Sequence, residues 1–166
     1  MTPLDKLRKL LDLFRQPSET SRLGRGKPLR QAAAAVFRGE AEKRELLLIT
    51  SRDTGRWIVP KGWIENDEDG PAAALREAWE EAGVTGELVS PRSIGHYRYV
   101  KQRPRRGDVL CDVDVYEVNL KEEKKQWPEK TERTRQWFPV AEAIGLVDEP
   151  GLKDLIRAAM DLGEAA

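Results

Sequence analysis

The sequence GWIENDEDGPAAALREAWEEAGV, residues 62–84, has the pattern of a polar loop followed by one amphipathic helix. Ala, Leu and Glu dominate residues 71–82, a composition with high helix propensity. Asp69 is a suitable N-cap, Pro71 suits the first turn, and Gly83 is a suitable C-cap. The sequence therefore predicts a capped helix directly after the loop.

The predicted helix has two chemically distinct stripes at about 100° per residue. One stripe is apolar and is expected to face the core: Leu75, Ala78, Trp79 and Ala82. The opposite stripe carries Glu77, Glu80 and Glu81, at spacings that bring the carboxylates together. A solvated acidic face is the ordinary interpretation of such a stripe. Like charges at these spacings repel, however, and the helix dipole disfavours carboxylates in the last turn.

A bound divalent cation would turn this repulsion into attraction. Ligands that are all carboxylate oxygens suit Mg²⁺ or Mn²⁺ rather than zinc. The spacing of the three glutamates therefore indicates a metal site on the helix.

Strand-like runs surround this helix, and a second amphipathic helix follows them. The expected strands are 31–38, 45–51, 57–60, 87–93, 95–100, 109–120 and 137–140. Apolar residues at helical spacing predict the final helix: Leu152, Leu155, Ile156, Ala159 and Met160. The pattern is that of an α/β protein with helices packed on a sheet. We expect residues 1–29 to form an N-terminal helix with a basic linker, and residues 30–163 to form the main domain.

Composition excludes several other classes of protein. The 166 residues include 29 basic and 29 acidic side chains, so the zero net charge argues against general nucleic-acid binding. Cys111 is the only cysteine, which excludes an intrachain disulfide and favours a reducing, cytoplasmic location. No apolar run approaches the roughly 20 residues that span a bilayer, so we expect no membrane association. Nothing in the sequence indicates an oligomeric state.

The stretch over 62–84 also matches the whole Nudix box, G-x5-E-x7-R-E-U-x-E-E-x-G-U, in which U is aliphatic. The matching residues are Gly62, Glu68, Arg76, Glu77, Ala78, Glu80, Glu81, Gly83 and Val84. The chain thus resembles the Nudix hydrolases over about residues 30–160. The resemblance implies an α/β/α sandwich with a mixed β-sheet and a Mg²⁺-dependent cleavage of a phosphoanhydride bond, in which Mn²⁺ can substitute.

The resemblance also implies a role for each residue of the box. It assigns catalysis to Glu77, Glu80 and Glu81, and it places four residues at the metal: Gly62, Glu77, Glu80 and Glu81. Glu80 resembles the proton acceptor, with a further metal ligand as the alternative role. Glu68 and Arg76 resemble a structural pair that braces the loop against the helix.

Flanking residues resemble one subfamily, the diphosphoinositol polyphosphate and diadenosine polyphosphate phosphohydrolases. The similar segments are SRDTGRWIVPKG, residues 51–62, and RTRQWF, residues 133–138. Trp63 departs from the subfamily, which usually has glycine there. A small-molecule polyphosphate is the substrate that this resemblance implies, because arginine and lysine bind phosphate well. Eleven residues are the expected substrate contacts: Arg30, Arg38, Ser51, Arg52, Lys61, Lys101, Arg103, Arg105, Arg106, Arg133 and Arg135.

Several alternatives stay open at this point. The run from Lys101 to Arg106 is also typical of a solvated loop, and Arg133 and Arg135 have acidic neighbours with which to pair. Tyr97 and Tyr99 suit either base stacking or strand packing. The rival functions are a Nudix hydrolase of another nucleoside diphosphate derivative (an NTP, ADP-ribose or a capped RNA end) and a catalytically silent Nudix binding domain. A silent domain would be expected to lose box glutamates, and this chain keeps them all.

Overall fold

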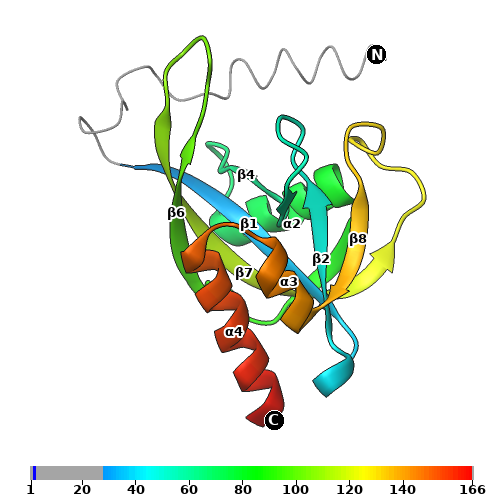
Figure 1. Cartoon of the computed structure of the whole chain (residues 1–166). Coiled ribbons are helices and arrows are strands. Elements are labelled where there is room, and N and C mark those ends of the chain that lie inside the picture. Colours follow the sequence, from blue (N-terminus) through cyan, green and yellow to red (C-terminus); the bar gives the residue numbers. More distant parts are fainter. Residues whose placement is uncertain (1, 3–27, 166) are drawn as a thin grey trace.

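A mixed β-sheet with helices on both faces forms the core of the computed structural model, which describes residue 2 and residues 28–165. Helix α2 covers one face of the sheet, and α3 and α4 cover the other (Figure 1). The N-terminal helix and linker predicted for residues 1–29 lie almost entirely outside the described residues. None of the helices in the described part of the chain is long and apolar enough to cross a membrane.

The sheet is mixed because β1 pairs parallel with β7, while its other pairings are antiparallel. The strands are β1 (Leu29–Arg38), β2 (Glu45–Thr50), β3 (Trp57–Ile58), β4 (Lys61–Trp63), β5 (Val84–Leu88), β6 (Gly95–Lys101), β7 (Val109–Glu123) and β8 (Arg135–Pro139). The helices are the short 3-10 helix η1 (Ala41–Lys43), α2 (Gly70–Ala82), α3 (Val140–Leu146) and α4 (Pro150–Ala165). This arrangement confirms the expected α/β/α sandwich with a mixed sheet.

Strand β1 lies at the centre of the sheet and alternates between two cores. Ala33, Ala35 and Phe37 pack with α3 and α4, whereas the residues between them pack with α2: Ala32, Ala34 and Val36. Successive side chains of a strand point to opposite faces, so this one segment contributes to both layers. Most of the residues that β1 presents to α2 are alanines, which leave room for a closely packed helix.

The core face of α2 differs from the predicted one. Trp79 was expected to face the core, but it lies 36% exposed on the surface. The buried residues of the helix are Ala73, Ala74, Glu77, Ala78, Glu81 and Ala82. The surface beneath α2 is filled by small side chains of β1, and two glutamates occupy part of the buried stripe instead of the indole. The helix is therefore turned so that acidic groups enter the interior beside β4.

Short elements account for most of the other differences. The strand predicted over 87–93 is wrong in its bounds, because β5 begins at Val84 and ends at Leu88, three residues before Pro91. Strand β4, helix α3 and η1 were not predicted. They contain 3, 7 and 3 residues, too few to produce a clear hydrophobic period.

Candidate active site

Helix α2 is fixed at both ends by the predicted capping residues. The Asp69 carboxylate accepts a hydrogen bond from the Ala72 backbone N–H at 2.9 Å. Gly83 adopts the left-handed conformation, with φ 66°, and its N–H bonds back to the Trp79 carbonyl at 3.0 Å. These caps confirm the predicted helix ends. They hold the glutamates of the last turn in a defined place.

Gly62 lets strand β4 approach Glu77 closely. It lies in the middle of β4, opposite Ala32 of β1. A Cβ atom at Gly62 would lie 2.2 Å from the Glu77 Oε1 atom, so only glycine fits there without displacement. Burial, and then the neighbouring Glu81, raise the pKa of Glu77 well above its usual value. Such a carboxylate is stabilised by a cation.

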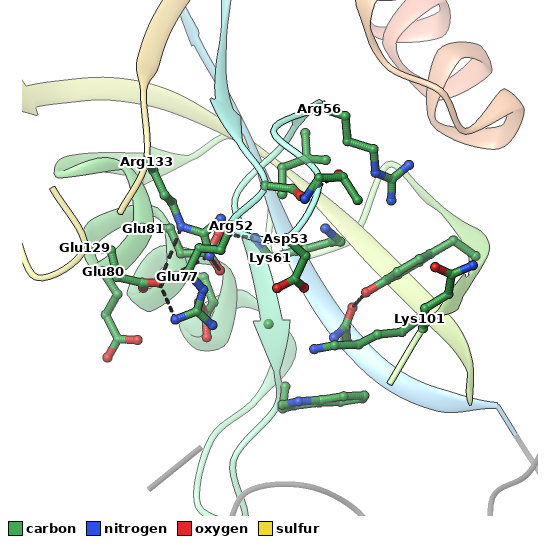
Figure 2. Close-up of a pocket in the computed structure, with 18 of the residues that line it drawn as sticks. Arg52, Asp53, Arg56, Lys61, Glu77, Glu80, Glu81, Lys101, Glu129 and Arg133 are labelled. Atoms are coloured by element: carbon green, nitrogen blue, oxygen red, sulfur yellow. Dashed lines mark hydrogen bonds and ion pairs between the residues drawn. The ribbon is translucent and has the colours of Figure 1, made fainter. Parts of the chain in front are cut away.

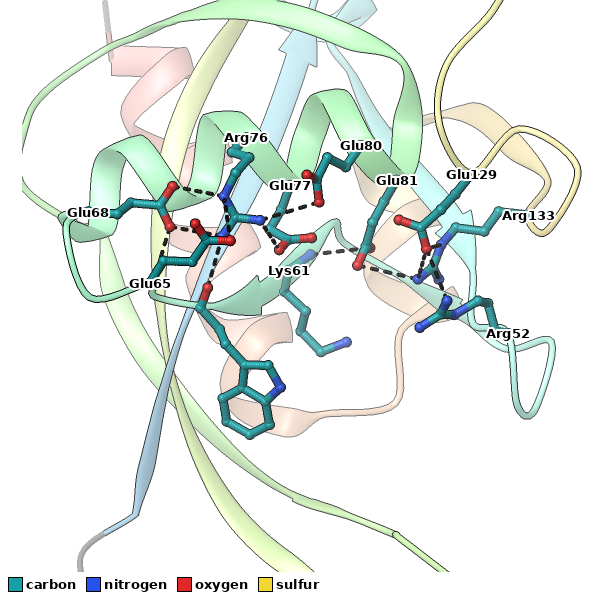
Figure 3. A network of polar contacts seen from close by, with 11 residues as sticks. Arg52, Lys61, Glu65, Glu68, Arg76, Glu77, Glu80, Glu81, Glu129 and Arg133 are labelled. Carbon is teal, nitrogen blue, oxygen red and sulfur yellow. Dashed lines mark hydrogen bonds and ion pairs between the residues drawn. The ribbon is translucent and has the colours of Figure 1, made fainter. Parts of the chain in front are cut away.

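Glu81, in the last turn of α2, belongs to an ionic network with Arg133, Glu129 and Arg52 (Figure 3). It is 7% exposed, its Oε1 lies 3.3 Å from the Arg133 guanidinium, and its Oε2 accepts from the Lys61 backbone N–H at 3.4 Å. Arg133 also pairs with Glu129 at 3.2 Å, and Arg52 pairs with Glu129 at 3.4 Å. The network neutralises Glu81 with a neighbouring arginine.

Arg76 holds the loop and the helix together. Its Nε and Nη2 atoms donate to the two carboxylate oxygens of Glu68, each at 2.8 Å, and Nη2 also donates to the Trp63 carbonyl at 2.9 Å. Its Nη1 atom reaches Glu77 at 2.7 Å and Glu80 at 3.3 Å. Burial lowers the pKa of Arg76, but the hydrogen bonds to Glu68 and Glu77 outweigh it and raise that pKa. The predicted contact between Glu68 and Arg76 is thus present.

The three glutamates were expected to converge, and the structure instead pairs them with neighbouring cations. Among the described residues, no three His, Cys, Asp or Glu side chains are gathered in a metal-binding arrangement. Glu77 and Glu80 bond to Arg76, and Glu81 bonds to Arg133. The donor chemistry nevertheless fits a hard divalent cation, because the buried Glu77 carboxylate lies against Gly62 and is repelled by the neighbouring Glu81.

These groups line a pocket with a volume of about 860 Å³. Its acidic residues are Asp53, Glu77, Glu80, Glu81 and Glu129, and its basic residues are Arg52, Arg56, Lys61, Lys101 and Arg133. Figure 2 shows the α2 carboxylates on one side and Lys101 on the other. Burial lowers the pKa of Lys61, an effect that Glu81 partly offsets. The pocket can hold a metal against one wall and anionic groups against the other.

Five of the eleven expected substrate contacts line this pocket: Ser51, Arg52, Lys61, Lys101 and Arg133. Arg30 and Arg38 do not. Arg30 pairs with Asp114 of β7, while the Arg38 guanidinium bonds to Glu45 at 2.9 Å and stacks over Trp137 at 4.4 Å. Both arginines therefore engage sheet residues rather than the pocket.

The basic loop between β6 and β7 is used in part to stabilise itself. Arg103 is 8% exposed, and it donates to the carbonyls of Gly107 and Arg106 at 3.0 and 3.4 Å. Arg105 and Arg106 do not appear in the pocket wall either. Only the beginning of this run, at Lys101, Gln102 and Pro104, lines the pocket.

Arg135 holds the end of α2 instead of lining the pocket. Its Nη1 atom donates to the carbonyls of Ala82 and Lys124 at 3.0 and 2.9 Å. Its guanidinium stacks over Trp127 at 4.0 Å, and the Trp127 indole N–H donates to the Glu81 carbonyl at 3.2 Å. Arg135 and Trp127 thus fix the last turn of the helix that carries Glu81.

We expect Arg135→Met to lower the free energy of unfolding by about 1–3 kcal/mol, because two backbone carbonyls lose their donor. The KM for a polyphosphate substrate should stay unchanged. The matched comparison is Arg52→Met, which removes a pocket guanidinium and should raise that KM. Denaturant unfolding and steady-state kinetics of both variants measure these effects. A raised KM for Arg135→Met with unchanged stability would instead make Arg135 a substrate contact.

Sequence reasoning missed several pocket residues. Arg56 pairs with Glu149 at 3.0 Å, and Glu129 pairs with Arg133 and Arg52. Gln31, Asp53 and Trp63 are further examples, and Tyr99, for which base stacking and strand packing were both left open, also lines the pocket. The sequence could have indicated Arg56 as a pocket residue, because it lies in the same segment as Ser51 and Arg52. It could also have indicated Trp63, because this residue departs from the subfamily. Gln31 and Glu129 have no such signal, because only the folded chain brings them to the box.

The fold and the box helix together define a Nudix domain, and the family model described as NUDIX domain matches residues 28–159. Nudix hydrolase 16, mitochondrial, of Arabidopsis thaliana is 37% identical over 116 residues, which cover 68% of this chain and 63% of the relative. Diphosphoinositol polyphosphate phosphohydrolase 3-beta of Homo sapiens is 38% identical over 117 residues, covering 69% and 66%. The chain therefore belongs to the Nudix family. The match spans just under two thirds of the length of both relatives.

Solved structures agree with the fold. A C. elegans Ap4A hydrolase superposes with a TM-score of 0.59 and 22% identity, covering 82% of this chain and 98% of that chain. A NUDIX hydrolase from Nitrosomonas europaea gives a TM-score of 0.63 and 18% identity, covering 82% and 91%. At these identities the likeness concerns the fold alone.

Proposed function

We propose that this protein is a hydrolase that cleaves a phosphoanhydride bond in a polyphosphate substrate with the help of Mg²⁺. One observation carries the proposal: three of the four box glutamates, Glu77, Glu80 and Glu81, line the same pocket as five basic side chains. Carboxylates alone would suit a metal, and bases alone would suit an anion. Together they suit a metal-bound polyphosphate, in which both kinds of charge are needed.

The metal would be held by oxygen atoms of Glu77, Glu81 and Gly62. Nudix enzymes generally use a divalent metal ion, and Mg²⁺ and Mn²⁺ match an oxygen-only donor set. When bound, the ion neutralises negative charge that develops on phosphate oxygens during cleavage. Glu81 would exchange its contact with Arg133 for the metal, and Arg133 would keep its contact with Glu129.

Glu80 is the group that we assign as proton acceptor. It is less buried than Glu77 and Glu81, and it lines the pocket on the same helix face. A carboxylate placed there would take a proton from the attacking water, a role worth about 10²–10⁴ in rate. The alternative, a further metal ligand, predicts that Glu80→Gln weakens metal binding as well as turnover.

Basic residues of the pocket would bind the phosphate chain. Arg52, Lys61, Lys101 and Arg133 come from different segments and face the same space. Each contact to a phosphate is a charge-assisted hydrogen bond of about 1.5–3 kcal/mol before desolvation. The human relative is named for diphosphoinositol polyphosphates, and the C. elegans structure is an Ap4A hydrolase. We therefore propose diphosphoinositol or diadenosine polyphosphates as the substrate class.

A cleavage screen, in which the products are separated by anion-exchange chromatography, tests this function directly. The purified chain is incubated with Ap4A, Ap5A, Ap6A, diphosphoinositol polyphosphates, ADP-ribose and NTPs, with Mg²⁺, Mn²⁺ or EDTA. We expect metal-dependent cleavage that is fastest for the polyphosphates. Preference for ADP-ribose or NTPs would point to the alternative specificity, and no cleavage of any compound would point to a silent binding domain.

We expect Lys101→Ala to raise the KM for Ap5A by about tenfold, because one phosphate contact of roughly 1.4 kcal/mol is a factor of ten. Arg105→Ala is the matched control, since it removes an exposed cation of the loop that follows Lys101 and does not line the pocket. Added salt should weaken the effect of Lys101. Equal KM values for the two variants would contradict a role for Lys101 in binding.

A cytoplasmic location, favoured by the single cysteine, belongs to the same proposal. The Arabidopsis relative is named as mitochondrial, so relatives occur in more than one compartment.

A further inference from the structure

We propose that Trp63 and Lys101 form a nucleobase subsite, in which the indole stacks against a base of the substrate. The inference rests on the proposed function, and it selects the base-bearing polyphosphates within that substrate class. A dinucleoside polyphosphate is the chemical class of ligand that such a subsite takes.

Strand alternation places Trp63 in the pocket wall. Gly62 faces α2, where it lies against Glu77, so its neighbours Lys61 and Trp63 point to the opposite face of β4. Trp63 lies directly across from Gln31 of β1, and all of these residues line the pocket. Strand β4 thus presents Gly62 to α2 and the Trp63 indole to the pocket.

Strand β6 completes the same wall. Tyr99 and Lys101 are two residues apart, so their side chains share one face of the strand. The Tyr99 hydroxyl donates to Gln31 at 2.7 Å, which ties β6 to β1. Lys101 Nζ lies 5.1 Å from the centre of the Trp63 ring, and Lys61 Nζ lies 5.1 Å from the centre of the Tyr99 ring. The wall therefore consists of two pairs, each an aromatic ring with an ammonium group.

The electrostatics of an aromatic face decide which ligand suits this wall. The face of an indole carries negative potential, which attracts an ammonium group and repels phosphate. An inositol ring bearing many phosphates would present anions to Trp63. A nucleobase is flat and uncharged, and it stacks on such a face. When a base stacks there, Lys101 can turn from the indole to a nearby phosphate, so one substrate uses both side chains.

Arg76, which holds the loop against the helix, also fixes the position of Trp63. The Trp63 carbonyl accepts from Arg76, and the same guanidinium bonds to Glu68, Glu77 and Glu80. The Arg76 side chain thus holds both the backbone of Trp63 and the carboxylates of α2. A base on Trp63 would lie at a set distance from the reacting phosphate, and this favours a particular length of phosphate chain.

The test compares ligands with and without a base. Equilibrium dissociation constants for Ap5A and for inorganic tripolyphosphate are measured by calorimetry with EDTA in place of Mg²⁺, so that no cleavage occurs, for the wild type, Trp63→Leu and Trp63→Phe. Stacking on an aromatic side chain is worth about fivefold to 150-fold in affinity per base. We expect Trp63→Leu to raise the Kd of Ap5A at least tenfold and to leave that of tripolyphosphate unchanged. Trp63→Phe should retain most of the affinity for Ap5A.

Trp79→Leu is the matched control, because Trp79 is an exposed tryptophan that does not line the pocket. It should leave both Kd values unchanged. Equal losses for Ap5A and tripolyphosphate in Trp63→Leu, or no loss for either, would overturn the subsite. Binding is measured without turnover, so a protein that binds Ap5A through Trp63 but does not cleave it when Mg²⁺ is added would contradict the proposed hydrolysis and leave the subsite standing.

Discussion

Glu81→Gln is expected to lower kcat/KM for a polyphosphate by about a thousandfold while the protein remains folded. The carboxylate is one of two buried groups assigned to the metal. Metal stabilisation of the developing charge is worth several kcal/mol, and each 1.36 kcal/mol is a factor of ten. Glutamine keeps the size and a carbonyl oxygen but removes the charge. Steady-state kinetics over a range of Mg²⁺ concentrations measure the loss, and raised Mg²⁺ should recover only part of it.

The fold should tolerate this substitution. Arg133 keeps Glu129 as an ionic partner, and the repulsion between Glu77 and Glu81 disappears. Because Glu81 raises the pKa of Glu77, its neutralisation should lower that pKa. Glu87→Gln is the control, an exposed carboxylate of β5 that does not line the pocket. Turnover by Glu81→Gln close to that of this control would remove Glu81 from the metal site.

Regular patterns made much of the fold predictable. The capped helix over α2 follows from Asp69 and Gly83, and in the strand expected over 109–120 the alternating residues Cys111, Val113 and Val115 form one buried face of β7. Neighbouring residues determine these features, so they can be predicted from the sequence alone. Trp79 was misplaced because helical periodicity alone does not show how small the facing surface is. The alanines of β1 pack closely against the small residues of α2, and this close packing leaves no space for the Trp79 indole.

The pocket was less predictable than the helix. Charge alone did not distinguish arginines that face the pocket from those with other partners. Arg135 and Arg133 are two residues apart in the sequence, yet one caps α2 and the other lines the pocket. Arg103 lies in a basic run but bonds to carbonyls of its own loop. Only the packed chain shows which carbonyls and carboxylates lie within reach of each guanidinium.

Arg76→Met is expected to have the largest effect on stability, a loss of about 2–4 kcal/mol in the free energy of unfolding. Removal of one partner from a buried ion pair leaves the other charges uncompensated, which costs about 3–5 kcal/mol when burial is complete. The estimate here is lower because the Arg76 side chain is 19% exposed. Glu68 and Glu77 lose their shortest ionic contacts, and the Trp63 carbonyl loses a donor.

The loss should depend on pH in a defined direction when no metal is added. Arg76 lowers the pKa of Glu77, so its removal raises that pKa further above the value in the unfolded chain. A carboxylate whose pKa is raised by folding destabilises the native state at high pH, and the penalty disappears as the pH falls and the group takes up a proton. The difference between wild type and Arg76→Met should therefore shrink from pH 8 to pH 5, as measured by denaturant unfolding. Adding Glu68→Met should recover part of the stability at pH 8, because one orphaned charge is gone. A difference that is constant with pH, and no recovery in the double variant, would mean that Arg76 stabilises the loop by packing alone.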